Sequence, residues 1–118
     1  MKIPMAYGKR QLELVLPDEC DATILRARPQ PTLKDARQAT RDAIERPIGS
    51  PPLSAVARGR RNACVVISDI TRPAPNRDML PPILETIEAA GVPRQAITIL
   101  IATGIHRPNE GEELVELV

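Results

Sequence analysis

The chain has 118 residues, and its 16 Lys and Arg nearly balance its 15 Asp and Glu, giving a formal net charge of +1. This length suits one small domain with one core. The near-zero charge excludes general attraction to nucleic acid or to an anionic membrane. Tyr7 is the only Tyr, Phe or Trp, so the core must be aliphatic and the stacking surface of a single-strand binder is missing.

The cysteines and the lengths of the apolar segments indicate where in the cell the protein is expected. Cys20 and Cys64 lie far apart, without the spacing of a metal site or of a disulfide framework. The first ten residues, MKIPMAYGKR, lack the apolar stretch of a signal peptide, and no segment approaches transmembrane length. We therefore expect a soluble, cytoplasmic protein.

The first elements along the chain are a predicted β-hairpin and an extended connection. Residues 3–7 are predicted to form the first strand, and Gly8-Lys9 supplies the turn to the second. In the second strand, residues 11–16, leucines alternate with polar residues. Residues 17–31 contain three prolines and are expected to be extended.

Two helices are predicted next. The first begins with Thr32 as its N-cap and Asp35 at the capping-box position, and it ends near Arg46 because a proline follows. Residues 47–52 form a linker rich in Pro, Gly and Ser, and a short helix is expected from Leu53 to Arg58.

The second half of the chain predicts a strand–helix–strand unit. Residues 63–67 and 96–101 are continuous apolar runs rich in β-branched side chains, which is typical of strands buried on both faces of a parallel sheet. A helix between such strands gives parallel neighbours with a right-handed crossover. The expected fold is therefore α/β.

The helix of this unit is predicted from apolar residues that repeat at helical spacing between Met79 and Ile87. Pro81-Pro82 is expected near its first turn, where free N–H groups make proline tolerable. Gly91 suits the end of the helix. Asn109, with Glu112, is predicted to cap a last helix.

A polar segment follows each predicted strand. Residues 68–73 read Ser-Asp-Ile-Thr-Arg-Pro, and residues 102–108 read Ala-Thr-Gly-Ile-His-Arg-Pro. In an open α/β sheet, ligands bind beyond the carboxyl ends of the strands. The two segments are therefore predicted to form one polar site.

The first segment offers Asp69 and Arg72. The planar guanidinium of Arg72 can bind a carboxylate or phosphate through two hydrogen bonds. Asp69 can accept from a ribose hydroxyl, from Arg72 or from an imidazole. The alternative interpretation is a capped turn that Pro73 ends.

The second segment offers Thr103, Gly104, His106 and Arg107. His106 is the only histidine, and an imidazole exchanges protons near neutral pH. Thr103 and Gly104 permit a tight turn whose amides can cradle an anion. The alternative is that His106 is simply exposed. The acidic residues that follow, Glu110, Glu112 and Glu113, are interpreted as first-turn carboxylates of the last helix.

The order strand–SDITRP–helix–strand–ATGIHRP resembles the N-terminal domain of the nickel-pincer lactate racemase family, best over about residues 62–113. The resemblance implies a Rossmann-like parallel sheet with flanking helices, preceded by the N-terminal hairpin. It implies an isomerase that interconverts stereoisomers of a small 2-hydroxy acid by hydride transfer to a nickel-pincer pyridinium mononucleotide.

The same resemblance implies roles for individual residues. His106 matches one of the family's two acid–base histidines, Arg72 an arginine that contacts the substrate or cofactor anion, and Asp69 an acidic residue of the same pocket. Thr103 and Gly104 would shape the loop under the cofactor.

The chain also departs from the family pattern. It has no second histidine. Its three lysines, Lys2, Lys9 and Lys34, lie outside the matching region, so no covalent anchor for the cofactor is visible in it. No metal ligand is assigned to it. We therefore expect residues 1–118 to form a single, truncated N-terminal domain that holds half an active site, needs a C-terminal domain as its partner and is inactive alone.

Two other interpretations stay open. One is a stand-alone module that holds a phosphate or carboxylate through Arg72, Thr103 and Arg107 without chemistry. The other is a structural domain whose loops are only capped turns.

Overall fold

The computed structural model describes residues 1–118, which form two compact units, residues 1–31 and 32–118. The expectation of one domain over the whole chain stays a prediction. None of the helices combines the length and the apolar character that crossing a membrane requires.

The first unit is the predicted hairpin. Strands β1 (Lys2–Tyr7) and β2 (Arg10–Val15) pair in antiparallel fashion. The register sets Ile3 opposite Leu14, so the apolar residues of the two strands share one face. Residues 21–31 have no regular structure, as expected from their prolines.

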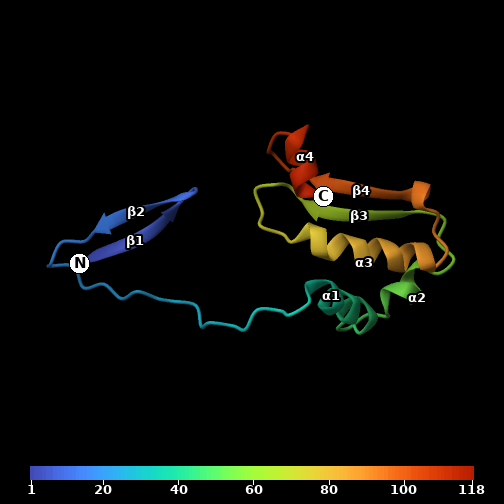
Figure 1. Cartoon of the computed structure of the whole chain (residues 1–118), viewed down its shortest axis with the longest axis horizontal. Coiled ribbons are helices and arrows are strands. Elements are labelled where there is room, and N and C mark those ends of the chain that lie inside the picture. The colour runs from blue at the N-terminus through green and yellow to red at the C-terminus, as the bar shows by residue number, and fades with distance from the viewer. The chain divides into compact units, whose positions relative to one another are not determined.

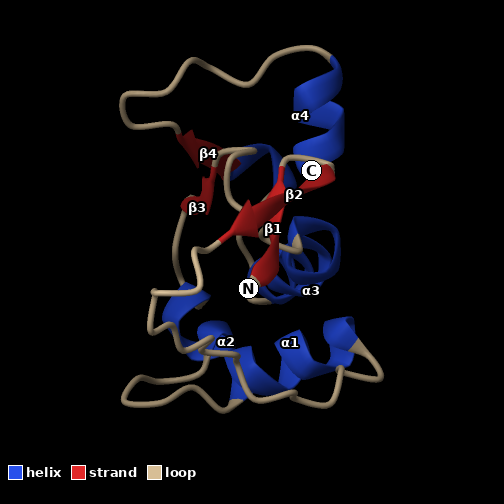
Figure 2. Cartoon of the chain, turned by 90° about the vertical axis from the view of Figure 1, so that its left-hand side faces the viewer, coloured by secondary structure: helices blue, strands red, loops and turns tan.

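The second unit has three layers, with α3 (Asn76–Ala89) between the sheet and the pair α1 (Ala36–Glu45) and α2 (Leu53–Ala57) (Figures 1 and 2). The sheet consists of β3 (Ala63–Ser68) and β4 (Ile97–Ala102), which pair in parallel. A 3₁₀ turn, η1 (Arg94–Ala96), precedes β4, and α4 (Glu112–Leu117) ends the chain. The predicted α/β class, with its parallel sheet, flanking helices and hairpin, is confirmed.

A small aliphatic core holds α2, α3 and the starts of both parallel strands together. Ala57, Ile87 and Val92 are buried at its centre, and Val65 and Ile97 pack against them. The core therefore lies at the end of the sheet away from the two polar loops.

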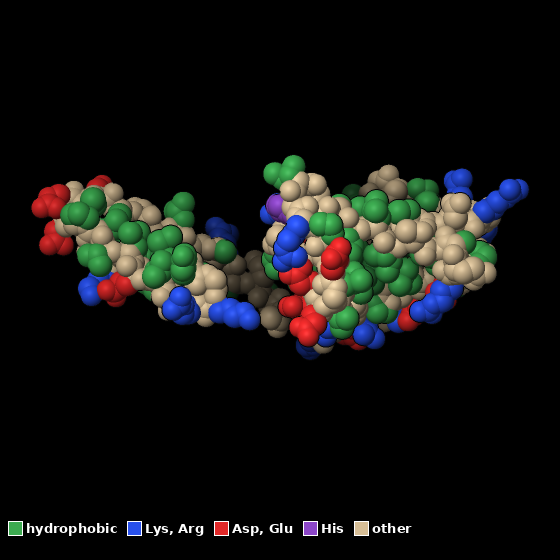
Figure 3. Space-filling model, turned by 90° about the horizontal axis from the view of Figure 1, so that it is seen from above, with side chains coloured by type: hydrophobic (Ala, Val, Ile, Leu, Met, Phe, Trp, Pro, Cys, Tyr) green, Lys and Arg blue, Asp and Glu red, His purple; other side chains and the backbone are tan.

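The prediction that both strands are buried on two faces is wrong. Only α3 covers the sheet, and on the other face the side chains of Val66 and Leu100 are 60% and 53% exposed. Figure 3, in which the molecule is seen from above relative to Figure 1, shows hydrophobic side chains exposed on the surface of this unit. A β-branched run indicates a strand, but the number of covered faces depends on what packs against it.

Two helix starts also differ from prediction. The N-cap of α1 is Asp35, whose Oδ1 accepts a 2.8 Å hydrogen bond from the amide of Gln38, and not Thr32. An Asp directly before the first helical residue is the better cap, because its carboxylate reaches the N3 amide. The N-cap of α4 is Gly111, with φ at +58°, and Asn109 is used elsewhere.

Helix α3 begins earlier than predicted, so its prolines lie inside it. Pro81 and Pro82 occupy its sixth and seventh positions. A proline at position 81 frees the carbonyl of Arg77 from its helical partner. The guanidinium of Arg37 donates to that carbonyl at 3.3 Å, so the freed acceptor is satisfied from α1.

Candidate functional site

The two polar loops start side by side at one edge of the parallel sheet. The register places Ser68, the last residue of β3, opposite Ala102, the last residue of β4. Because both strands run in the same direction, the segments that follow them emerge together (Figure 1). This is the edge at which ligands bind in open α/β sheets.

Asp69 is the anchor of the site. Its side chain is 5% exposed, and its Oδ1 accepts hydrogen bonds from the hydroxyl of Thr71 at 2.6 Å and from the amide of Thr71 at 3.3 Å. Its Oδ2 lies 2.5 Å from Nδ1 of His106. The hydrogen bond from the Thr71 hydroxyl, and after it the one from His106, lowers the pKa of Asp69. The carboxylate is therefore ionised near neutral pH.

His106 is held by a turn of its own loop. Its amide donates to the carbonyl of Thr103 at 2.9 Å, and the turn has Gly104 at φ +57°. Other residues adopt that angle only at a cost. Because the ionised Asp69 can only accept, Nδ1 of the neutral imidazole carries the hydrogen and Nε2 keeps its lone pair. The His106 side chain is 47% exposed, so solvent and ligands can reach it.

A polar hollow of about 270 Å³ lies between the loops. Residues of both segments line it: Ser68, Asp69, Arg72, Ala102, Thr103, Gly104, Ile105 and His106. The structure thus brings five of the six predicted site residues to one hollow, and it does not bring Arg107 there.

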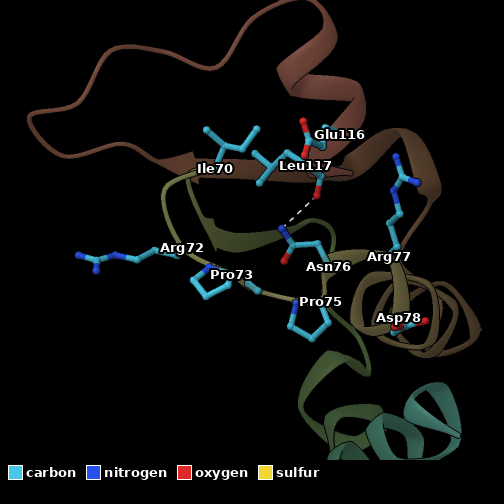
Figure 4. Close-up of a pocket in the computed structure, with 10 residues that line it drawn as sticks. Ile70, Arg72, Pro73, Pro75, Asn76, Arg77, Asp78, Glu116 and Leu117 are labelled. Atoms are coloured by element: carbon cyan, nitrogen blue, oxygen red, sulfur yellow. Dashed lines mark hydrogen bonds between the residues drawn. The ribbon is translucent and has the colours of Figure 1, made fainter. Parts of the chain in front are cut away.

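Arg72 and Arg107 differ in what they bind within the chain. The guanidinium of Arg107 makes a two-pronged ion pair with Glu113, at 2.7 and 2.6 Å. Arg72 takes part in none of the ion pairs of the chain. In Figure 4 its side chain extends away from the neighbouring residues. Its donors are free for an external anion.

The two amides predicted to cradle an anion are not equivalent. The amide of Thr103 donates to the carbonyl of Ile101 at 3.1 Å, whereas the amide of Gly104 has no partner among the loop hydrogen bonds. Of these two amides, only that of Gly104 is available to a ligand.

Comparison with known proteins shows the family of this chain. A family described as "Lactate racemase N-terminal domain" matches residues 7–118. The chain belongs to the lactate racemase N-terminal domain family. The resemblance of the two loop motifs to that family is thereby confirmed.

Individual relatives give the extent of the similarity. The chain is 34% identical over 115 residues to lactate racemase of Lactiplantibacillus plantarum, covering 96% of this chain and 27% of the relative. It is 36% identical over 124 residues to lactate racemase of Thermoanaerobacterium thermosaccharolyticum, covering 97% of this chain and 29% of the relative. The structure of that lactate racemase apoprotein matches with a TM-score of 0.76 and 36% identity, over 98% of this chain and 26% of the other.

The chain thus spans less than a third of the length of the curated relatives that it matches. No group of three or more His, Cys, Asp or Glu side chains in it is arranged to hold a metal ion.

Sequence reasoning missed the contacts that Asn109 and Glu113 make near the site of this domain. Asn109 was expected to cap α4, but its Oδ1 accepts from the amide of Ile70 at 3.3 Å and its Nδ2 donates to Glu113 at 3.2 Å. Glu113 was interpreted as a first-turn carboxylate only. Asn109 and Ile70 are 39 residues apart, and no local pattern signals such a contact.

Proposed function

We propose that this chain forms one wall of the active site of a lactate racemase-like enzyme, which interconverts stereoisomers of a small 2-hydroxy acid. The observation that supports it best is the Asp69–His106 pair, joined at 2.5 Å at the ligand-binding edge of the sheet. A carboxylate that orients an imidazole and fixes its tautomer is a recurring arrangement for general acid–base catalysis.

The proposed reaction needs a hydride acceptor and a proton acceptor. The nickel-pincer pyridinium mononucleotide implied by the family resemblance supplies the first when it is bound. His106 supplies the second for one enantiomer: its Nε2 takes the hydroxyl proton of that enantiomer and gives it back when that enantiomer re-forms. Inversion follows when the hydride returns to the opposite face of the oxidised carbon and an acid–base group of the C-terminal domain supplies the hydroxyl proton. Asp69 holds the ring throughout and stabilises the imidazolium that forms when Nε2 is protonated.

The hollow fits the anionic part of such a ligand. Arg72 lines it with an unpaired guanidinium, which matches a substrate carboxylate or a cofactor phosphate through two hydrogen bonds. The amide of Gly104 is the second donor.

These residues form only half of the proposed site. A racemase handles two mirror-image substrates, so it needs an acid–base group on each side of the reacting carbon. His106 is the only histidine of the chain. We therefore propose that residues 1–118 act as the N-terminal domain of a longer protein whose C-terminal domain completes the site, and that they do not racemise a hydroxy acid alone.

The test is His106→Ala in the full-length, cofactor-loaded enzyme, with interconversion of D- and L-lactate followed by chiral chromatography. The rate should fall by roughly 10²- to 10⁴-fold, the usual contribution of a general acid–base group, while the cofactor content stays unchanged. Activity within twofold of the wild type would contradict the proposed role.

A second candidate function rests on the free Arg72 guanidinium. The chain alone would then be a binding module for a phosphate or carboxylate group, without chemistry. Nicotinamide mononucleotide added to the 118-residue chain tests this by NMR. Binding that His106→Ala leaves unchanged and Arg72→Ala removes would favour the module, provided that His106→Ala also leaves the full-length enzyme active.

A further inference from the structure

The segment that carries His106 is long and has no regular structure of its own. It covers residues 103–111, between the end of β4 and the start of α4. A loop of this length samples many conformations unless contacts restrict it. The 2.5 Å contact between His106 and Asp69 therefore needs support from elsewhere in the fold.

Three side chains supply that support, and we call them the loop clasp: Arg107, Asn109 and Glu113. The carboxylate of Glu113 accepts two hydrogen bonds from Arg107, at 2.7 and 2.6 Å, and one from Asn109 at 3.2 Å. Two-pronged arginine–carboxylate pairs are geometrically specific. The clasp thus ties the second half of the loop to the first turn of α4.

Asn109 extends the clasp to the other loop. While its Nδ2 donates to Glu113, its Oδ1 accepts from the amide of Ile70 at 3.3 Å. Ile70 directly follows Asp69. The residues flanking both members of the Asp69–His106 pair are therefore connected through Asn109.

Helix α4 is itself fixed to α3, so the clasp rests on a rigid element. Asn76, 6% exposed in the first turn of α3, donates from its side chain to the carbonyl of Leu117 at 3.0 Å (Figure 4). Arg77 donates to the carbonyl of Val115 at 3.1 Å. A continuous series of contacts thus runs from α3 through α4 to the His106 loop.

The clasp also accounts for the different surroundings of the two loop arginines. Arg107 binds Glu113 within the chain and does not line the hollow. The Arg107 side chain pairs with a carboxylate whose pKa this contact lowers to about 2, so the pair persists at neutral pH. One edge of the Arg107 guanidinium is thus occupied by Glu113, whereas Arg72 has no such partner.

We propose that Glu113 is a positioning residue, which holds the His106 imidazole against Asp69 by binding Arg107 and Asn109. The inference rests on the proposed function only for its kinetic consequence. Arg107 then stabilises the loop by binding Glu113, and Arg72 is the arginine that binds the ligand anion.

The first experiment does not use activity. In the ¹⁵N-labelled 118-residue chain at pH 8, the exchange of the His106 Nδ1 hydrogen with water is measured by NMR. Glu113→Ala should speed this exchange roughly tenfold, because a loop without its ties opens more often. Glu112→Ala is the matched control. Glu112 is an acidic residue of the same turn of α4 but forms no ion pair, so its loss should leave the exchange rate unchanged.

A second variant covers the case in which Glu113→Ala disturbs α4. Arg107→Gln removes a side chain that is 72% exposed, so the core is unaffected, and it should speed the exchange to a similar extent. The double variant should exchange no faster than Glu113→Ala alone, because that change already breaks the pair with Arg107. Exchange at the wild-type rate in Arg107→Gln, or additive effects, would overturn the proposal.

The second experiment is kinetic. In the full-length, cofactor-loaded enzyme, Glu113→Ala should lower kcat about tenfold with little change in KM, because a misplaced acid–base group slows the chemical step more than binding. An unchanged kcat would contradict the inference. If His106→Ala itself leaves activity intact, the proposed function fails, and the exchange measurement still decides whether Glu113 positions the imidazole.

Discussion

The two loops at the edge of the sheet both contain an arginine followed by a proline, and they use it differently. Arg72, in the loop after β3, pairs with no carboxylate and lines the hollow. Arg107, in the loop after β4, is bound by Glu113 through two hydrogen bonds and lies outside the hollow wall. The same local sequence is therefore found in two different environments, because a carboxylate lies within reach of Arg107 and none lies within reach of Arg72.

The loops also differ in how they are held. Asp69 is fixed by Thr71, two residues away, within its own loop. His106 is fixed by Asp69, which is 37 residues away, and its loop is fixed by Asn109 through Ile70. The Asp69 side chain therefore has a partner within its own loop, whereas the only side-chain partner of His106 lies in the other loop. The predictions below test this difference.

The largest effect is expected from Asp69→Asn, which disrupts the link between the loops. The amide of Asn presents a donor to Nδ1 of His106, which favours the tautomer with its hydrogen on Nε2. That tautomer cannot accept the hydroxyl proton. In the full-length enzyme, kcat should fall by roughly 10²-fold or more, measured by chiral chromatography of lactate.

The matched control for this change is Asp42→Asn, at an exposed carboxylate of α1 that pairs only with groups of its own helix. It should leave kcat as in the wild type. A kcat for Asp69→Asn within twofold of the wild type would show that the pair is structural.

A smaller effect is expected when each loop arginine becomes lysine, which keeps the charge and loses the planar fork. Arg72→Lys should raise KM about tenfold, since a charge-assisted hydrogen bond to the ligand anion is weakened. Arg107→Lys should instead lower kcat a few-fold (about threefold), because a single contact to Glu113 replaces two. Steady-state kinetics of both variants measure the difference, and equal changes in KM would remove the distinction between the two arginines.

The smallest effect is expected from acid. The pKa of Glu113 is lowered from 4.5 to about 2, first by the hydrogen bonds from Arg107, and the pKa of Asp69 is also lowered, from 3.8. A carboxyl group with a lowered pKa in the folded state stabilises that state above its unfolded pKa, and this contribution is lost as the pH falls toward the folded value.

Stability of the chain should therefore be flat between pH 7 and about 5 and should decrease from about pH 4.5 toward pH 2. Urea unfolding followed by circular dichroism measures it. Glu113→Gln should show a shallower decrease than the wild type over this window. A decrease of the same steepness would mean that the Arg107 pair does not contribute to stability.

Much of the site's location could be predicted from the sequence. Two apolar β-branched runs with a helix between them imply parallel neighbours, and the segments after them must then emerge at one edge. The same reasoning predicts that Asp69 and His106 lie close together, and their side chains are 2.5 Å apart. The hairpin around Gly8 and the end of α1 before Pro47 also follow from local turn chemistry and proline geometry.

The residue that caps each helix was less predictable, because several neighbouring side chains can form the same hydrogen bond. Thr32 and Asp35 are both acceptable caps, and the helix begins after Asp35 because its carboxylate reaches the amide of Gln38. Asn109 fits a capping pattern equally well, yet the approach of Ile70 gives its side-chain oxygen a different donor.

The sequence by itself determined the periodicities and the turns, because these depend on interactions between residues a few positions apart. It thereby determined that the site lies after β3 and β4. Only the tertiary structure decided that Arg107 binds Glu113 while Arg72 stays free, that Asn109 joins the two loops, and that one face of the sheet is exposed. Those outcomes depend on which groups from distant segments meet in space, and a hydrogen bond between side chains forms only within about 3 Å.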